Sequence, residues 1–179
     1  MSTYLNLGCG SLLMKNAINV DSSSPNNLSE EYVFVKEDVI QYLKKCNREQ
    51  FSKVFMFYFL EHLDYQQVTY LTYLLNHVLK MGGEVIGVTE DFDEICQQYL
   101  NYKNRILAIE SFRYNVLSDG IVETVHKSLW NKELLTLYFG IDGFHLFDLQ
   151  QRVGSRNVGM FFKFKKIVRV GIDPKLTEV

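Results

Sequence analysis

The sequence predicts an α/β fold, in which short apolar strands alternate with helices and connecting segments. The first three apolar runs are each followed within three residues by a glycine or an acidic residue, as is typical where buried parallel strands end. A helical repeat of apolar residues over 65–79 then ends at a glycine pair. Repeated alternation of strand and connection predicts a mostly parallel sheet with helices on its faces.

The expected elements of the first half of the chain follow from these runs. The expected strands are 4–7, 18–21, 32–35, 53–59 and 84–89, and the expected helices are 39–45 and 65–79. The longest apolar run, 54–60, is too short to cross a bilayer and suits a strand buried on both faces.

The segment 91–127 interrupts this rhythm, because it is rich in tyrosine, asparagine and glutamate. We expect a helix over 93–112, and we expect the whole segment to cover the substrate. The last expected elements are a helix over 131–139 and two strands, 144–149 and 159–168, that form an antiparallel hairpin. No repeat or second domain is visible, so 1–179 is interpreted as one domain.

Composition restricts the function classes. The net charge of −2 argues against a protein that coats nucleic acid, although the stretch 152–175 is basic. Three widely spaced cysteines and an N-terminus without a basic and apolar leader favour a reduced, cytoplasmic location with no membrane attachment. The surplus of aromatic residues and an uncovered sheet edge weakly favour a homodimer.

Glycines and acids follow the first three expected strands. Gly8 and Gly10 come directly after the first strand, where glycine lets the backbone approach a ligand. Asp21 ends the second strand and suits the ribose hydroxyls of an adenosine, although it also suits a simple turn. Asp38 suits either the adenine amino group or the N-cap of the next helix. Together these residues predict a nucleoside site at the carboxyl edge of the sheet.

Two phosphate-binding alternatives fit less well. The glycine loop lacks the third glycine of the dinucleotide fingerprint, and the sequence has no P-loop Gly-Lys-Ser/Thr. The connection 8–17 has only ten residues, so its helix must be short or absent. A ligand without a pyrophosphate, such as S-adenosylmethionine (SAM), fits this connection better.

Four motifs carry a family resemblance. Residues 5–10 (LNLGCG) and 18–21 (INVD) resemble the first two motifs of class I SAM-dependent methyltransferases, closest to the small type-11-like group. Residues 59–63 (FLEHL) and 78–83 (VLKMGG) resemble that group's V-L-E-H-L and R-V-L-K-P-G-G. The resemblance implies a Rossmann-like three-layer sandwich, with a mostly parallel seven-stranded sheet whose last strand is antiparallel.

The resemblance also implies a set of SAM contacts. They are Gly8, Cys9, Gly10, Asp21, Ser22, Asp38, Val39, Phe57 and Tyr58. Some related enzymes bind a metal through E-x-x-E-H, but Tyr58 stands here in place of the first ligand. We therefore expect no metal, with Glu61 and His62 orienting the loop and capping the following helix.

The expected activity is methyl transfer to a small-molecule or glycan acceptor, at a hydroxyl group. Displacement at a sulfonium depends mainly on alignment, and a general base is needed where the acceptor must lose a proton. His126 and His62 are the candidates for that role, although both are equally well explained as structural histidines. The alternatives are a non-catalytic SAM-binding protein and an enzyme that acts on nucleic acid or protein. Tyr99, Tyr102, Arg105 and Arg113 are unranked candidates to line a substrate lid.

Overall fold

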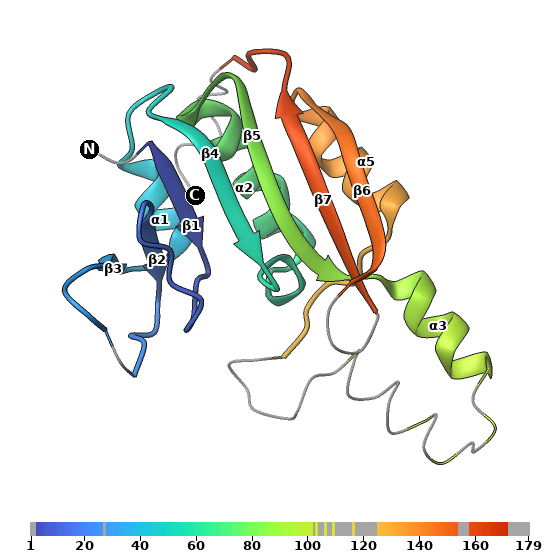
Figure 1. Cartoon of the computed structure of the whole chain (residues 1–179). Helices are drawn as coiled ribbons and strands as arrows, with labels where there is room; N and C mark the ends of the chain where they lie inside the picture. Colours follow the sequence, from blue (N-terminus) through green and yellow to red (C-terminus); the bar gives the residue numbers. More distant parts are fainter. Residues whose placement is uncertain are drawn as a thin grey trace.

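The structure is a computed structural model that describes residues 3–26, 28–101, 103, 106, 109, 116, 125–153 and 158–171. A seven-stranded sheet forms its centre (Figure 1). The strands are β1 (Tyr4–Leu7), β2 (Ile18–Asp21), β3 (Val33–Lys36), β4 (Phe51–Phe57), β5 (Leu79–Glu90), β6 (Phe144–Val153) and β7 (Gly159–Lys166). The helices are α1 (Val39–Lys44), α2 (Tyr65–Val78), α3 (Phe92–Asn101) and α5 (Lys132–Ile141), with a 3-10 turn, η1, at Leu60–His62.

The strand order is β3-β2-β1-β4-β5-β7-β6, and the seven-stranded sheet that the resemblance implied is confirmed. β1 to β5 pair in parallel, and β7 is antiparallel to both β5 and β6. The expected C-terminal hairpin is therefore confirmed, with the last strand inserted between β5 and β6. In this order the carboxyl ends of β1 to β5 meet at one edge of the sheet.

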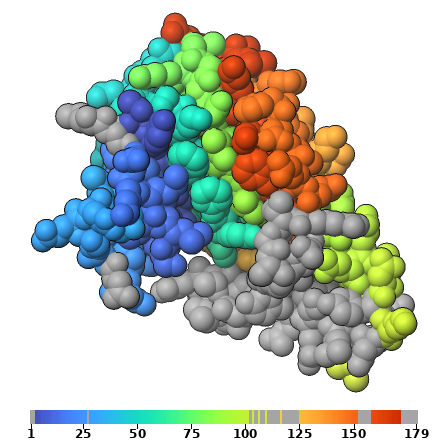
Figure 2. All heavy atoms as spheres, in the orientation of Figure 1, coloured from blue at the N-terminus to red at the C-terminus, as the bar shows by residue number. Residues whose placement is uncertain are grey.

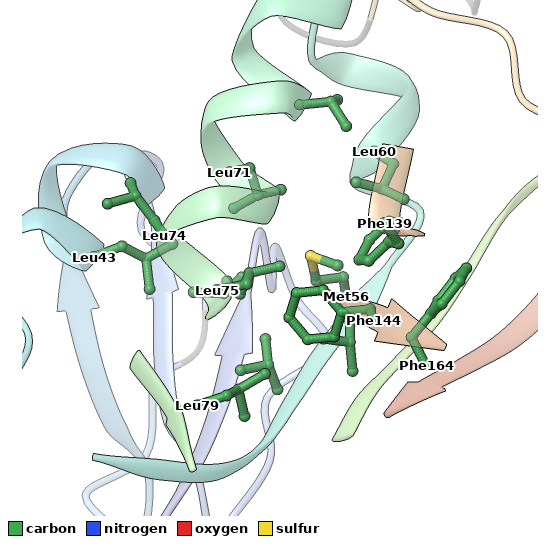
Figure 3. Close-up of a cluster of buried hydrophobic side chains, with 14 of the residues drawn as sticks. Leu43, Met56, Leu60, Leu71, Leu74, Leu75, Leu79, Phe139, Phe144 and Phe164 are labelled. Carbon is green, nitrogen blue, oxygen red and sulfur yellow. The ribbon is translucent and has the colours of Figure 1, made fainter. Parts of the chain in front are cut away.

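Helices α1, α2 and α5 lie on one face of the sheet, where α2 contacts both α1 and α5 (Figure 1). The main hydrophobic core lies between this layer and the strands. In α2, Leu71 and Leu75 point towards Met56 and the aromatic rings of α5, β6 and β7, whereas Leu74 lies beside Leu43 of α1 (Figure 3). The apolar stripe that predicted the helix is thus the stripe that enters the core.

The opposite face of the sheet exposes strand side chains, which Figure 2 shows as a surface running from the blue to the red strands. The connection 8–17 contains no helix, as its length predicted. On this face Phe55, Phe57 and Phe161 are half-buried, with Phe55 and Phe57 stacked at 6.2 Å between ring centroids. Among the described helices, none is long and apolar enough to cross a membrane.

The junction between α2 and β5 differs from the prediction that the glycine pair ends the helix. β5 begins at Leu79 directly after the helix, so the glycine pair lies inside the strand and does not end the helix. The pairing with β4 shifts register between Phe51 and Lys53, which accommodates the early start. Gly82 has a φ of +74°, a conformation that glycine adopts without strain.

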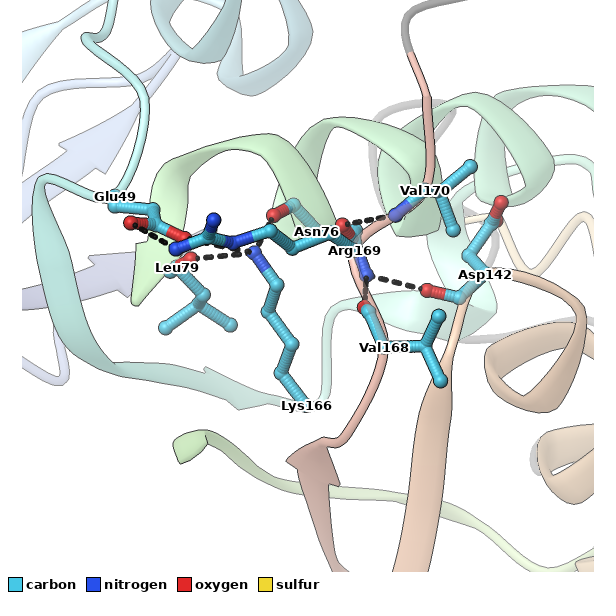
Figure 4. Close-up of polar contacts among 8 residues, drawn as sticks. All are labelled: Glu49, Asn76, Leu79, Asp142, Lys166, Val168, Arg169 and Val170. Atoms are coloured by element: carbon cyan, nitrogen blue, oxygen red, sulfur yellow. Dashed lines mark hydrogen bonds and ion pairs between the residues drawn. The ribbon is translucent and has the colours of Figure 1, made fainter. Parts of the chain in front are cut away.

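A buried lysine stabilises this junction (Figure 4). Lys166 of β7 is only 1% exposed, and its Nζ donates to the carbonyls of Asn76 (2.5 Å) and Leu79 (2.8 Å) at the end of α2. The Asn76 side chain in turn donates to the carbonyls of Asp142 (2.7 Å) and Val168 (2.8 Å). The two lysine bonds satisfy carbonyl groups that the end of α2 leaves without intrahelical partners.

The segment 91–127 is described only in part. Its expected helix begins as α3 at Phe92, and Tyr99 lies on it. The lid candidates Tyr102, Arg105 and Arg113 lie outside the described residues.

Candidate functional site

A cavity of about 650 Å³ opens at the carboxyl ends of β1, β2 and β4. It is lined by Gly8, Gly10, Asp21, Ser22, Ser23, Asp38, Val39, Ile40, Tyr58, Phe59, His62 and Leu63. Most of the expected SAM contacts are therefore brought together around one space. Cys9 and Phe57 are not among the lining residues; Cys9 is only 4% exposed, and its backbone N–H points to the Val20 carbonyl.

The glycine loop has a conformation that requires glycine at two positions. Gly8 and Gly10 have φ values of +58° and +47°. A Cβ added at Gly8 would lie 2.0 Å from Cδ2 of Phe59, whereas one added at Gly10 would meet nothing within 4 Å. Gly8 thus gives the ring of Phe59 its place in the cavity wall.

Two buried asparagines hold this loop without a helix. The Asn6 side chain donates to the Leu12 carbonyl (2.7 Å) and to Oδ1 of Asn19 (2.9 Å). Oδ1 of Asn19 also accepts from the Met14 backbone N–H (2.8 Å). Sequence reasoning missed this network, although asparagine in the middle of two short apolar strands is a signal, because strands are depleted of it.

Asp21 lines the cavity and makes the turn interaction that the sequence offered as one alternative. Its Oδ2 accepts from the Gly10 N–H (2.8 Å), and its Oδ1 accepts from the Ser23 N–H (2.8 Å), which is the turn interaction. The carboxylate therefore ties the glycine loop to the end of β2. A carboxylate offers about four acceptor positions, so further hydrogen bonds from a ligand are compatible with both of these.

Asp38 is the N-cap of α1 and lines the cavity as well. Its Oδ1 accepts from the Gln41 N–H (3.0 Å), which confirms the capping alternative. Tyr58 has a φ of +53°, an uncommon conformation for a residue other than glycine, and its N–H donates to the Val88 carbonyl (2.7 Å). Backbone strain of this kind gathers at functional sites.

A second group of polar side chains adjoins the cavity. Glu61 in η1 is 3% exposed, and its Oε2 accepts from the Thr89 hydroxyl (2.9 Å). The rings of His62 and His126 lie 5.1 Å apart between centroids. Nδ1 of His126 is 3.4 Å from Oε2 of the buried Glu90. The structure thus brings the two catalytic candidates together, and it adds two acids that sequence reasoning did not assign to catalysis.

The position of His126 depends on bonds between its segment and η1. The backbone N–H groups of Lys127 (2.7 Å) and Ser128 (3.3 Å) donate to the Glu61 carbonyl. The Ser128 hydroxyl donates to the Leu60 carbonyl (3.1 Å) and accepts from Nε1 of the buried Trp130 (2.8 Å). The chain after the partly described segment is therefore fixed against the end of β4.

Burial changes the protonation of this group. It raises the pKa of Glu61 to about 8, an effect that hydrogen bonds to the backbone and Thr89 oppose and the nearby Glu90 charge increases. Burial also lowers the pKa of His62, so its imidazole is neutral at pH 7. A neutral imidazole can accept a proton or bind a metal ion.

The sequence matches no protein-family model and no curated protein. Solved structures do match. A SAM-dependent methyltransferase from Archaeoglobus fulgidus aligns with 92% of this chain and 86% of its own, at 16% identity and a TM-score of 0.64. A putative methyltransferase from Haloferax volcanii, in complex with the activator Trm112, aligns with 96% of this chain and 84% of its own, at 10% identity and a TM-score of 0.66.

A third match carries ligands. The 1,6-didemethyltoxoflavin-N1-methyltransferase from Burkholderia thailandensis, with S-adenosylhomocysteine bound, aligns with 92% of this chain and 71% of its own, at 12% identity and a TM-score of 0.63. Identities this low show likeness of fold alone. Together with the strand order, they establish that this chain has the class I fold of SAM-dependent methyltransferases.

Proposed function

We propose that this protein is a SAM-dependent methyltransferase that binds SAM in the cavity at the ends of β1, β2 and β4. One observation carries the proposal: the Gly10 N–H donates to the Asp21 carboxylate. This bond places the glycine loop, whose backbone a ligand can approach closely, next to an acid that can bind a ribose. In α/β sheets, ligands bind at this edge, and an acid in this place accepts hydrogen bonds from a ribose.

Each part of SAM has a matching group in this proposal. Asp21 accepts from the ribose hydroxyls, and Asp38 accepts from the adenine amino group, with Val39 beside the base. Gly8 and Gly10 leave room for the methionine part, and Tyr58 and Phe59 form the apolar wall. Ser22 also lines the cavity, whereas the expected contacts Cys9 and Phe57 do not.

The proposed acceptor is a hydroxyl of a small molecule or a glycan. In the transfer, the S–CH₃ bond of SAM breaks, an O–CH₃ bond forms and the hydroxyl proton leaves. His62 lines the cavity and His126 lies next to it, so we assign both to the acceptor side of the site. Two of the similar structures, from Burkholderia thailandensis and Bradyrhizobium japonicum, are N-methyltransferases by name. The proposal of an oxygen acceptor therefore rests on the histidine and acid group of this chain and not on those matches.

Transfer of a labelled methyl group tests the proposal. The protein is incubated with methyl-labelled SAM and low-mass or glycan fractions, and products are treated with alkali, which cleaves methyl esters and spares methyl ethers. We expect alkali-stable label in these fractions, lost with Asp21→Ala and retained with Asp148→Ala, a control on β6 far from the cavity. Label confined to nucleic acid or protein would contradict the proposed acceptor class.

A further inference from the structure

Carboxylate and imidazole groups converge beside the cavity in a pattern that the proposed SAM contacts do not use. One donor atom from each of Glu61, His62 and His126 lies within 4.8 Å of the other two. We propose that these three residues bind a divalent first-row transition cation. Its use in methyl transfer rests on the function proposed above, whereas its binding does not.

The donor set indicates the kind of cation. Two imidazoles and one carboxylate suit Zn²⁺, Co²⁺, Mn²⁺ or Fe²⁺, whereas Mg²⁺ and Ca²⁺ prefer oxygen ligands throughout. Sites with three protein ligands leave a coordination position for water or substrate. A site of this composition therefore fits a catalytic cation better than a structural one.

A small void lies beside two of the three proposed ligands. It has a volume of about 10 Å³ and is lined by Glu61 and His126 together with Glu90, Ser128 and apolar side chains, whereas His62 lines the neighbouring SAM cavity. A void of this size holds about one water-sized sphere. Ligand atoms about 2.1 Å from a tetrahedral metal lie about 3.4 Å apart, so donors that now lie within 4.8 Å of one another need to approach by up to about 1.4 Å.

The charges at the cluster also favour a cation. Glu61 and Glu90 are 3% and 8% exposed, and two carboxylates in so buried a place are costly unless positive charge or protons compensate them. A dication supplies that charge. Glu90 lies 3.4 Å from Nδ1 of His126, where a carboxylate orients the ring of a metal-binding histidine.

The prediction of no metal was based on the ligands of one sequence motif. Tyr58 does replace the first acid of that motif, and it lines the SAM cavity. The fold instead brings His126 to η1 from a distant part of the chain, through the bonds of Lys127 and Ser128 to Glu61. The third ligand therefore has no counterpart in the motif itself.

The cation has a direct use at this position. His62 belongs both to the cluster and to the wall of the SAM cavity, so an acceptor hydroxyl can reach the open coordination position next to the methyl group. Binding to a cation lowers the pKa of such a hydroxyl. Its proton then leaves to solvent as the O–CH₃ bond forms and the S–CH₃ bond breaks. The two histidines act as ligands in this arrangement and not as a direct general base.

Titration of the chelator-treated protein with Co²⁺ tests the proposal, because cobalt bound by imidazole has a visible absorption spectrum. We expect one equivalent per chain, displaced by Zn²⁺ and not by Mg²⁺. Glu61→Gln, His62→Gln and His126→Gln should each weaken binding at least about tenfold. His145→Gln, on β6 away from the cluster, is the matched control and should bind Co²⁺ unchanged.

Thermal unfolding and SAM titration distinguish loss of the metal site from loss of the fold or of SAM binding. Glu61→Gln keeps an acceptor for the Thr89 hydroxyl, and thermal unfolding shows that each variant is folded. The absence of saturable binding, or equal affinity in all three variants, would overturn the proposal. SAM titration of the same samples separates the two proposals: SAM binding without cobalt binding rejects the metal site alone, and cobalt binding without SAM binding supports the metal site while rejecting the proposed function.

Discussion

Replacing Gly8 by alanine tests whether the glycine loop is shaped by Phe59. The added Cβ would lie 2.0, 2.5 and 2.8 Å from Cδ2, Cγ and Cε2 of that ring, so the ring has to move by more than an ångström. Forcing extra atoms into a packed site costs about 1–3 kcal/mol. The positive φ of +58° adds about 1–2 kcal/mol for any residue with a Cβ. We expect Gly8→Ala to lower the free energy of unfolding by about 3 kcal/mol.

Gly10→Ala is the matched control. It has the same kind of backbone strain at a φ of +47°, but its Cβ meets nothing within 4 Å, so only about 1–2 kcal/mol should be lost. Urea unfolding of both variants measures the difference. Adding Phe59→Ala to Gly8→Ala removes the clash, and a double-mutant cycle should give a coupling energy of about 1 kcal/mol or more. Equal losses for the two glycine variants, or additive energies in the cycle, would refute the reasoning.

Three further predictions concern stability and reactivity. Lys166→Met leaves the carbonyls at the end of α2 without their donor, so urea unfolding should show a loss of about 2 kcal/mol, and an unchanged midpoint would contradict the role of this lysine. Ser128→Ala leaves the buried Trp130 N–H without its acceptor and should cost about 1–3 kcal/mol, whereas the exposed Ser11→Ala should cost almost nothing. Burial, together with the negative charge of Asp21, raises the pKa of the Cys9 thiol to about 12. Because the thiolate is the reactive form, alkylation of Cys9 at pH 8 should be about a thousandfold slower in the folded protein than in the unfolded chain. The rate in the folded protein should increase as the pH rises. Mass spectrometry that finds Cys9 modified as fast in the folded protein would show that explanation to be wrong.

The sequence predicted the parallel half of the fold well because its signals are local. Strands β1 and β2 have the predicted bounds, and the short connection between them forms no helix. The glycine pair after α2 was misleading, since the register shift between β4 and β5 lets the strand begin before it. A sequence pattern does not show such a shift, because it depends on the partner strand.

Some residues of the candidate site could be predicted from local sequence patterns and others could not. Gly8, Gly10, Asp21 and Asp38 could be found because each follows a strand, and strand ends meet at one edge of a parallel sheet. The buried lysine of β7 and the place of Glu90 beside His126 could not be found, because those contacts join residues far apart in the chain. Tertiary contacts of this kind leave no periodic or spacing signal.

The proposed function depends most directly on whether the cavity binds SAM at Asp21. Calorimetric titration of the purified protein with SAM and with S-adenosylhomocysteine measures this, with Asp21→Ala as the test variant and Asp148→Ala as the control. The account predicts saturable binding of both ligands to the wild type and the control, and at least a tenfold loss with Asp21→Ala. Absence of binding to the folded wild type, or equal affinity in the Asp21→Ala variant, would contradict it.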